Sequence, residues 1–484
     1  MKRIIAWGVA AGLLGYAAYG SAEQVRSISA ADKKAGAEAH PQLLAEFGGA
    51  YTPGPTSAYV TTVGRRIAVQ SGLANSQSEF TITLLNSPVN NAFAIPGGYV
   101  YTTRELVALM NDEAELASVL GHEVGHVAAR HSAKRQQAAQ RNSILGALLG
   151  LGIGAIAGDS GLGQLLQQGT GQAVQLLTLR YSRKQEYEAD DLGVRYLYSA
   201  GYDTLASSTM LASLAAQTSL DARAQGNDAR NLPEWASTHP DPAGRVVRAR
   251  KAAEQLGGTG RTRNRDTFLN AIDGLLYGDD PRQGIVDGST FRHPGLRIAF
   301  AAPRGFAIAN GTDAVSVSGS GGQAQFAGGR LTGSLSSYID NVYRQLGGQG
   351  SVGQVQTTQI NGVNAAYAVT RAQTNQGQVD VGIVAYQMGD GSAYHFVTLS
   401  PAGRGFGSFA PMVQSFRRLS AGEAAAIRPR RIDVVTVKAG DTVQGLAQRM
   451  AYDDLKLERF LTINALTGNS RLMPGQRVKL VVWG

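Results

Sequence analysis

The residues with the clearest chemical meaning lie at positions 121–126, where the sequence reads Gly-His-Glu-Val-Gly-His. Residues four apart on a helix face the same side, so the imidazoles of His122 and His126 can bind one metal ion. Glu123 follows the first histidine, and its carboxylate can reach a water molecule beside such an ion. This pattern is typical of zinc-dependent hydrolysis. The alternative is a surface helix that carries two unrelated histidines.

The neighbouring sequence predicts the helix that this chemistry requires. Asp112 and Glu115 form an acidic start similar to a capping box. Apolar residues then recur at helical spacing, at Leu116, Val119, Leu120 and Val127. We expect this helix to continue to about Ala139.

A zinc hydrolase also needs a third protein ligand. The chain contains no cysteine, so this ligand must be His, Asp or Glu. A second helix, predicted over residues 180–198, carries charged groups on an otherwise apolar stripe, where they need a partner or a metal. Glu186 is the expected third ligand, and Asp190 is expected to accept the free ring N–H of a ligating histidine, whereas Glu188 points elsewhere. The alternative is an exposed helix stabilised by charged pairs.

The two motifs together, His-Glu-x-x-His and then Arg-x-x-Glu-x-x-Ala-Asp at residues 183–190, resemble the HtpX-like gluzincin metallopeptidases, relatives of the CAAX prenyl endopeptidases. The resemblance covers residues 35–255. It implies a mainly helical, zincin-type domain that holds one Zn²⁺ per chain, with Glu186 as the third ligand. The chain lacks the set of spanning helices found in integral-membrane members, which favours a soluble periplasmic type.

The same resemblance gives roles to two further segments. Residues 91–101 resemble the strand and turn that precede the metal helix, which implies an edge strand for an extended peptide. The expected substrate-binding residues are Asn91, Ala92, Phe93, Gly97 and Gly98. Residues 237–240 resemble the family's Thr-His-Pro motif, which makes His239 a candidate catalytic donor to the oxyanion. His40 and His131 match no such position and are expected on the surface.

The chain begins with features of a secretory signal peptide at residues 1–22: a positive start, an apolar stretch and small residues. The alternative is an uncleaved membrane anchor. Residues 143–158 are apolar and uncharged but too few to span a bilayer, so they form either a buried or flap-like segment or an element that touches the membrane. The net charge of +9 comes from scattered basic residues, so no nucleic-acid partner is expected. We expect an exported protein of the bacterial periplasm or cell envelope.

The fold class expected is multidomain α+β. The metallopeptidase domain would occupy residues 23–262. Short alternating runs and Gly-rich turns predict a small α+β domain of unknown role at residues 266–420, with one helix at residues 334–346. A linker is expected at residues 421–432.

The last segment, residues 433–484, resembles a LysM domain. The resemblance rests on Val-Lys-Ala-Gly-Asp-Thr-Val at residues 437–443 and Met-Pro-Gly-Gln-Arg-Val at residues 473–478. It implies a separate βααβ unit, which either binds the glycan of peptidoglycan or serves as a structural appendage.

The expected function is zinc-dependent hydrolysis of peptide bonds in polypeptide substrates. The resemblance suggests misfolded or misassembled envelope proteins. Zn²⁺ would sit on His122, His126 and Glu186, with water in the fourth position, and Glu123 would carry the proton of that water to the leaving amine. A zinc-dependent peptidoglycan peptidase is one alternative, suggested by the LysM-like unit. A chaperone or scaffold with a residual metal site is another, although metal binding alone does not need Glu123.

Overall fold

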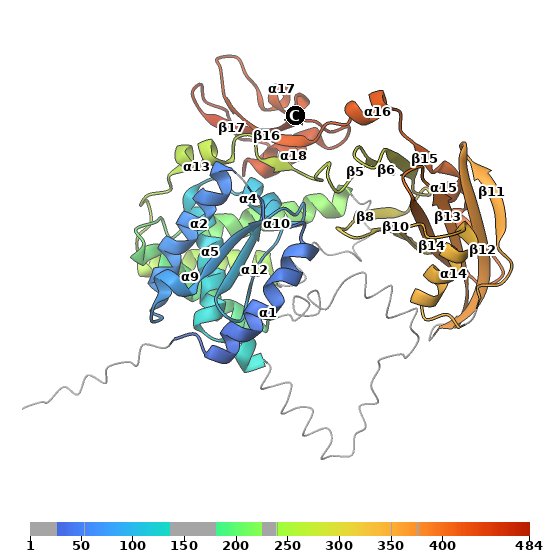
Figure 1. Ribbon diagram of the computed structural model, residues 1–484. Helices are drawn as coiled ribbons and strands as arrows, with labels where there is room; N and C mark the ends of the chain where they lie inside the picture. Colours follow the sequence, from blue (N-terminus) through green and yellow to red (C-terminus); the bar gives the residue numbers. More distant parts are fainter. Residues whose placement is uncertain are drawn as a thin grey trace, which may run out of the picture.

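The computed structural model describes residues 27–52, 54–135, 181–224, 239, 241–349, 351–374 and 377–484. A mainly helical body is followed by two smaller bodies rich in β-strands, and the C-terminal one lies against the helical body (Figure 1). The expected leader and the apolar segment at residues 143–158 lie outside the described residues. Among the helices of the described part, none combines the length and apolarity that crossing a membrane requires.

The helical body contains a small sheet and the helices around it. The helices are α1 (Ala30–Glu46), α2 (Pro55–Ala68), α3 (Ser76–Glu79), α4 (Arg104–Leu109), α5 (Glu113–Ala128), α9 (Arg183–Ser199), α10 (Ala206–Ala224), α12 (Pro242–Leu256) and α13 (Arg265–Ile272), with the 3₁₀ turn η1 (Val69–Ser71). The strands are β1 (Thr81–Leu85), β2 (Ala92–Ile95) and β3 (Tyr99–Thr103), in the order β1-β3-β2. Strand β2 is antiparallel to β3 and forms one edge of this sheet.

The side chains of β2 alternate between two cores. Ala92 belongs to the core that α2 and α5 share. Phe93 and Ile95 instead join Leu43 of α1 on the opposite face. Successive residues of a strand point to opposite faces, so the sheet is covered by α2 and α5 on one side and by α1 on the other. This packing places β2 alongside α5.

Helices α5 and α9 approach each other closely because glycines lie where they meet. A Cβ on Gly125 would lie 3.2 Å from the carbonyl oxygen of Ala189, and a Cβ on Gly193 would lie 3.2 Å from the backbone nitrogen of His122. Both distances are shorter than ordinary van der Waals contact, so larger residues would push the helices apart. The close packing brings the carboxylates of α9 against the histidines of α5.

Both helices begin at side-chain caps. Asp112 accepts a hydrogen bond from the backbone N–H of Glu115 at the start of α5, as the acidic start predicts. Ser182 and Gln185 form a capping box, so α9 begins at Arg183 and not at residue 180.

The prediction that the metal helix continues to about Ala139 is wrong. Helix α5 ends at Ala128. Arg130 adopts a left-handed backbone conformation with φ of 56°, which a right-handed helix cannot contain. A new helical segment begins at His131. The break turns the chain, so that residues after α5 fold back against the end of that helix.

The middle body is built on two sheets. The larger has the order β11-β12-β13-β14-β10-β9-β8 and the smaller the order β15-β7-β6-β5. Their strands are β5 (Ile285–Asp287), β6 (Thr290–His293), β7 (Ile298–Ala301), β8 (Ala307–Asn310), β9 (Val315–Gly319), β10 (Gly322–Arg330), β11 (Gln356–Ile360), β12 (Val363–Thr374), β13 (Gly377–Gln387), β14 (Ser392–Pro401) and β15 (Arg417–Arg418). Helix α14 (Leu335–Gln345) covers one face of the larger sheet, at the position of the expected helix. The core of the other face, which includes Phe300 and Phe326, joins the two sheets. The turn η2 (Gly407–Phe409) and helix α15 (Ala410–Ser415) complete the body.

The C-terminal unit has the expected strand–helix–helix–strand order. Its elements are β16 (Arg430–Thr436), α17 (Val443–Gln448), α18 (Lys456–Ile463) and β17 (Arg477–Trp483). The segment expected to be a linker, residues 421–432, contains the short helix α16 (Ala421–Ala425) and the first residues of β16.

This unit does not stand apart from the helical body. The short strand β4 (Leu276–Tyr277) pairs with β16 and extends its sheet. Phe460 and Leu480 belong to the same hydrophobic core as Leu106 and Leu116 of the helical body. The two regions therefore share one core, a continuity that the sequence pattern of each region does not reveal.

A buried lysine joins the two regions. Lys479 lies on β17 with none of its surface exposed. Its Nζ donates hydrogen bonds to the carbonyl oxygens of Ala108 at 2.7 Å and Leu109 at 3.3 Å, where α4 ends. The Lys479 side chain thus satisfies carbonyl groups that a helix end leaves without partners.

Candidate metal centre

Four buried side chains converge beside α5. His122 and His126 come from α5, Glu186 comes from α9, and His239 precedes α12. One potential ligand atom from each residue lies within 4.8 Å of those of the others. The Nε2 atoms of the two α5 histidines are 3.0 Å apart. Oε2 of Glu186 lies 3.5 Å from Nε2 of His122, and Oε1 of Glu186 lies 3.5 Å from Nε2 of His126. Three imidazoles and a carboxylate at these separations form the kind of donor set that transition metals bind.

The charges at this centre also fit a metal ion. Glu123 is fully buried, and neither of its carboxylate oxygens makes a hydrogen bond within the described part of the chain. Burial raises the pKa of Glu123. Burial alone would raise the pKa of Glu186 too, but the charge of His239 and hydrogen bonds from His122 and His239 lower it. Nη1 of Arg245 lies 2.9 Å from Oε2 of Glu186, and a divalent cation bound here would add positive charge beside both buried carboxylates.

The two α5 histidines differ in their surroundings. Burial, followed by the charge of His122, lowers the pKa of His126 well below its usual value. Burial also disfavours the charged form of His122, but hydrogen bonds to Asp190 and Glu186 outweigh it and raise the pKa of His122 to about 9. A metal ion that binds this group would therefore displace a proton from His122.

The ring nitrogen of His122 that faces away from the other candidate ligands contacts Asp190, and Arg245 contacts Asp190 in turn. Nδ1 of His122 lies 2.9 Å from Oδ1 of Asp190, the contact that the sequence predicts. Arg245 of α12 donates to both oxygens of Asp190, from Nε at 2.8 Å and from Nη2 at 2.6 Å. Burial would raise the pKa of Asp190, but Arg245 and then His122 lower it to about 2, so this carboxylate stays ionised. Arg245 was not among the residues predicted for the site. The signal in the sequence that could have identified Arg245 is a charged residue on the buried face of an amphipathic helix, here α12.

His239 lies within the group of potential ligands. Its Nδ1 is 3.1 Å from Oε2 of Glu186. Its Nε2 is 3.3 Å from the carbonyl oxygen of Ala92 on β2 and 3.7 Å from Oε1 of Glu123. The ring therefore links the candidate metal ligands to the edge strand, and it is placed to bind a metal ion itself.

The prediction that His131 lies on the surface is wrong. His131 is fully buried, and its Nδ1 is 2.8 Å from Nδ1 of His126. On its other side, Nε2 of His131 is 3.3 Å from Oε2 of Glu188. His40, also expected on the surface, is only partly exposed, and its Nδ1 is 2.7 Å from the hydroxyl of Tyr101.

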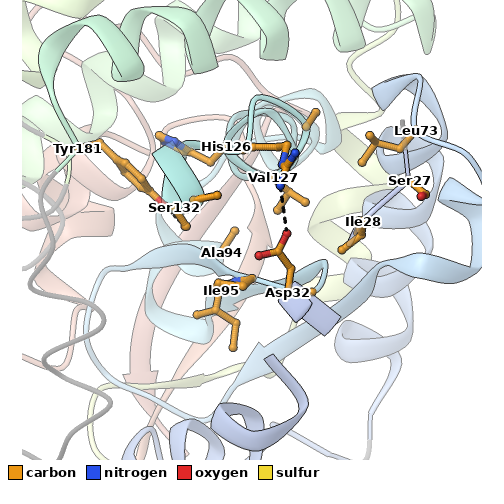
Figure 2. A pocket seen from close by; sticks show the side chains of 15 residues that line it. Ser27, Ile28, Asp32, Leu73, Ala94, Ile95, His126, Val127, Ser132 and Tyr181 are labelled. Carbon is orange, nitrogen blue, oxygen red and sulfur yellow. Dashed lines mark hydrogen bonds and ion pairs between the residues drawn. The ribbon is translucent and has the colours of Figure 1, made fainter. Parts of the chain in front are cut away.

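An apolar pocket adjoins His126, between the end of α5 and strand β2. Figure 2 shows Ala94 and Ile95 on one side of the pocket and His126 and Tyr181 on the other. The ring of Tyr181 stacks on that of His126, with centroids 3.9 Å apart. Ile28, Leu73 and Val127 contribute further apolar side chains. Asp32, which lines the same pocket, is paired with Arg130 at 4.0 Å.

Of the five residues expected to bind substrate, four do not line this pocket. Asn91 is buried, and its backbone N–H donates to the hydroxyl of Thr103. Phe93 is buried in the core that includes α1. Gly98 lies in the turn after β2, where a Cβ would come within 2.3 Å of the carbonyl oxygen of Glu79. Gly97 does line the pocket. The β2 region also contributes Ala94, Ile95 and Pro96, which were not among the expected residues.

Comparisons with known proteins agree with this geometry. Residues 55–253 match Peptidase family M48, and residues 435–481 match the LysM domain. The chain is similar to the beta-barrel assembly-enhancing protease of Yersinia pestis, with 33% identity over 205 residues that cover 41% of this chain and 39% of that protein. It is also similar to the mitochondrial metalloendopeptidase OMA1 of Schizosaccharomyces pombe, with 31% identity over 227 residues that cover 46% of this chain and 61% of that protein.

The matched parts cover less than two thirds of these relatives. The beta-barrel assembly-enhancing protease of Escherichia coli K12 gives the same result, with 32% identity over 202 residues, 41% of this chain and 39% of that protein. Among solved structures, a cyanobacterial PsbP protein from Synechocystis matches 28% of this chain at 10% identity, with a TM-score of 0.22.

Proposed function

We propose that the chain is a zinc-dependent endopeptidase of the bacterial cell envelope, because residues 55–253 match Peptidase family M48 and residues 435–481 match the LysM domain. One observation carries the proposal. The carboxylate of Glu123, without a hydrogen-bond partner in the described part of the chain, is buried beside the converging group of His122, His126 and Glu186. A site that only bound metal would not need this additional buried carboxylate.

His122, His126 and Glu186 would hold the zinc ion. Bound there, the ion would act as a Lewis acid that polarises the scissile carbonyl and makes a water molecule more acidic. Glu123 would accept the proton of the attacking water and deliver it to the leaving amine nitrogen. Burial raises the pKa of Glu123 and so makes its carboxylate a stronger base toward the attacking water.

The substrate would bind as an extended polypeptide along the edge of β2. Backbone hydrogen bonds to an edge strand fix an extended peptide without regard to its sequence. One substrate side chain would enter the pocket beside His126, whose lining favours an apolar residue. Unfolded proteins expose such side chains in extended segments, which favours protein substrates over peptides attached to peptidoglycan. The names of the bacterial relatives suggest proteins of β-barrel assembly as the physiological class.

The location and the second partner are part of this proposal. A LysM domain and relatives from bacterial envelopes favour export to the periplasm. Peptidoglycan is the partner that the LysM unit would bind. Its close packing on the peptidase would then place the active site at a fixed distance from the cell wall.

The proposal is tested by metal analysis and by cleavage of two substrates. The purified protein should contain one zinc ion per chain and should cut an unfolded protein at bonds next to apolar residues. Purified sacculi serve as the competing substrate. Release of peptides from sacculi without cleavage of the unfolded protein would favour the peptidoglycan peptidase. Zinc binding without cleavage of either would favour the scaffold.

A further inference from the structure

The residues behind His126 have a specific arrangement, and their role rests on the metal site of the proposed function. His126 presents Nε2 to the other candidate ligands. Its second ring nitrogen, Nδ1, faces Nδ1 of His131 at 2.8 Å. A histidine that binds a metal through Nε2 keeps its proton on Nδ1 and donates it to a neighbour. In that state, Nδ1 of His131 must be the acceptor.

This requirement fixes the tautomer of His131. Its Nδ1 accepts a hydrogen bond, so its proton lies on Nε2, which is 3.3 Å from Oε2 of Glu188. The hydrogen bonds then run in one direction, from His126 through His131 to the carboxylate. Because the ring of His131 and that of His126 are both buried, water does not compete with the contact between them.

The fold holds His131 in this place from two sides. The left-handed turn at Arg130 ends α5 and starts the helical segment that carries His131. From α9, the side-chain amide of Gln185 donates to the backbone carbonyl of His131 at 3.4 Å. Lys134 lies 3.8 Å from the other oxygen of Glu188. The side chain of Glu188 is 46% exposed and does not enter the metal group.

We propose that His131 and Glu188 are positioning residues that orient His126 for metal binding, as Asp190 and Arg245 orient His122. Helix α9 would then supply three carboxylates, one that binds the metal ion and two that orient the histidines of α5. Glu186 would bind the ion, Asp190 would hold the first histidine directly, and Glu188 would hold the second through His131. The signals in the sequence are a histidine five residues after His126 and a glutamate two residues after Glu186.

The test compares zinc affinity in variants of the full chain, measured by competition with a chelator. His131→Leu removes both hydrogen bonds and should weaken zinc binding by about 10–100-fold. His131→Gln should restore much of the loss, because its amide oxygen can accept from His126 while its NH₂ group donates to Glu188. Lys134→Ala is the matched control, since it removes a neighbour of Glu188 outside the chain of hydrogen bonds and should leave affinity unchanged.

A double-mutant cycle tests whether Glu188 acts through His131. Glu188→Ala should lower zinc affinity in the wild-type background and should have no further effect in His131→Leu. The absorption spectrum of bound Co²⁺ reports the ligand geometry independently of activity, and it should change in His131→Leu. Additive effects of the two substitutions, or unchanged affinity and spectrum in a folded His131→Leu variant, would overturn the proposal.

Two outcomes keep this test separate from that of the proposed function. If His131→Leu fails to fold, then His131→Gln and the partly exposed Glu188→Ala decide the matter, and unchanged affinity in Glu188→Ala overturns the role of the carboxylate. If the wild-type protein binds no zinc through His122 and His126, the proposed metal site itself is wrong.

Discussion

The shared core of the C-terminal unit and the helical body predicts that a substitution in one will destabilise the other. Phe460 lies on α18, is 0% exposed and belongs to the core that includes Leu106 and Leu116. Truncation of a fully buried phenylalanine to alanine typically costs about 3–5 kcal/mol, from lost burial and from the cavity left behind. We expect Phe460→Ala to lower the free energy of unfolding of the helical body, which carries the metal site, by about this amount.

The assay follows zinc release into a chromogenic chelator during denaturation, because the ion reports directly on the helical body. Phe326→Ala is the matched control: it deletes the same atoms at a residue 3% exposed, in the separate core of the middle body. It should leave zinc release unchanged. The reasoning fails if Phe460→Ala loosens only the C-terminal unit, as proteolysis would show, while the midpoint of zinc release stays at the wild-type value.

Three further predictions concern the metal centre. Asp190→Ala should weaken zinc binding by about 10–100-fold, because His122 loses the acceptor of its Nδ1–H; equal affinity would mean that Arg245 and Asp190 serve stability alone. The raised pKa of His122, about 9, means that this ring is protonated at pH 7 without metal. Zinc binding should therefore release a proton and strengthen as pH rises from 6 to 8. Calorimetry in buffers of different ionisation enthalpy measures this release, and its absence would contradict the assignment. His239→Ala should weaken zinc binding if His239 is a ligand, whereas a loss of turnover by roughly 10²–10³-fold at full zinc occupancy would identify an oxyanion donor.

Sequence reasoning predicted the parts of the site that depend on local helical geometry. His122 and His126 are one turn apart on one helix, as are Glu186 and Asp190 on another, and the structure places each pair on a single face. The LysM-like order of elements was also predictable, because its turn residues and strand patterns lie within one short segment.

The parts of the site that the sequence did not predict depend on contacts between segments that are distant along the chain. His131 turns toward His126 because the backbone reverses at Arg130, a conformation that the apolar stripe of α5 does not signal. Arg245 reaches Asp190 from a third helix. Helical phase predicted that Glu188 points away from the candidate ligands, and Glu188 is not among them, but it gave no information about the contact with His131.

The same limit applies to the domain organisation. Lys479 and Phe460 fit the pattern of an independent LysM unit, in which an apolar residue lies inside and a lysine lies outside. In the structure both are buried against the helical body. The apolar surface of each region is sufficient to predict a core, but it does not show that two regions share one.

The central claim is that the buried carboxylate of Glu123 moves the proton of the attacking water. The direct measurement is the rate of cleavage of an unfolded protein by Glu123→Gln, with zinc content measured on the same sample. The amide is nearly isosteric but cannot accept the proton, so zinc content should stay at the wild-type level while the rate falls by at least about 10²–10⁴-fold. Cleavage at the wild-type rate by the zinc-loaded variant would contradict the account.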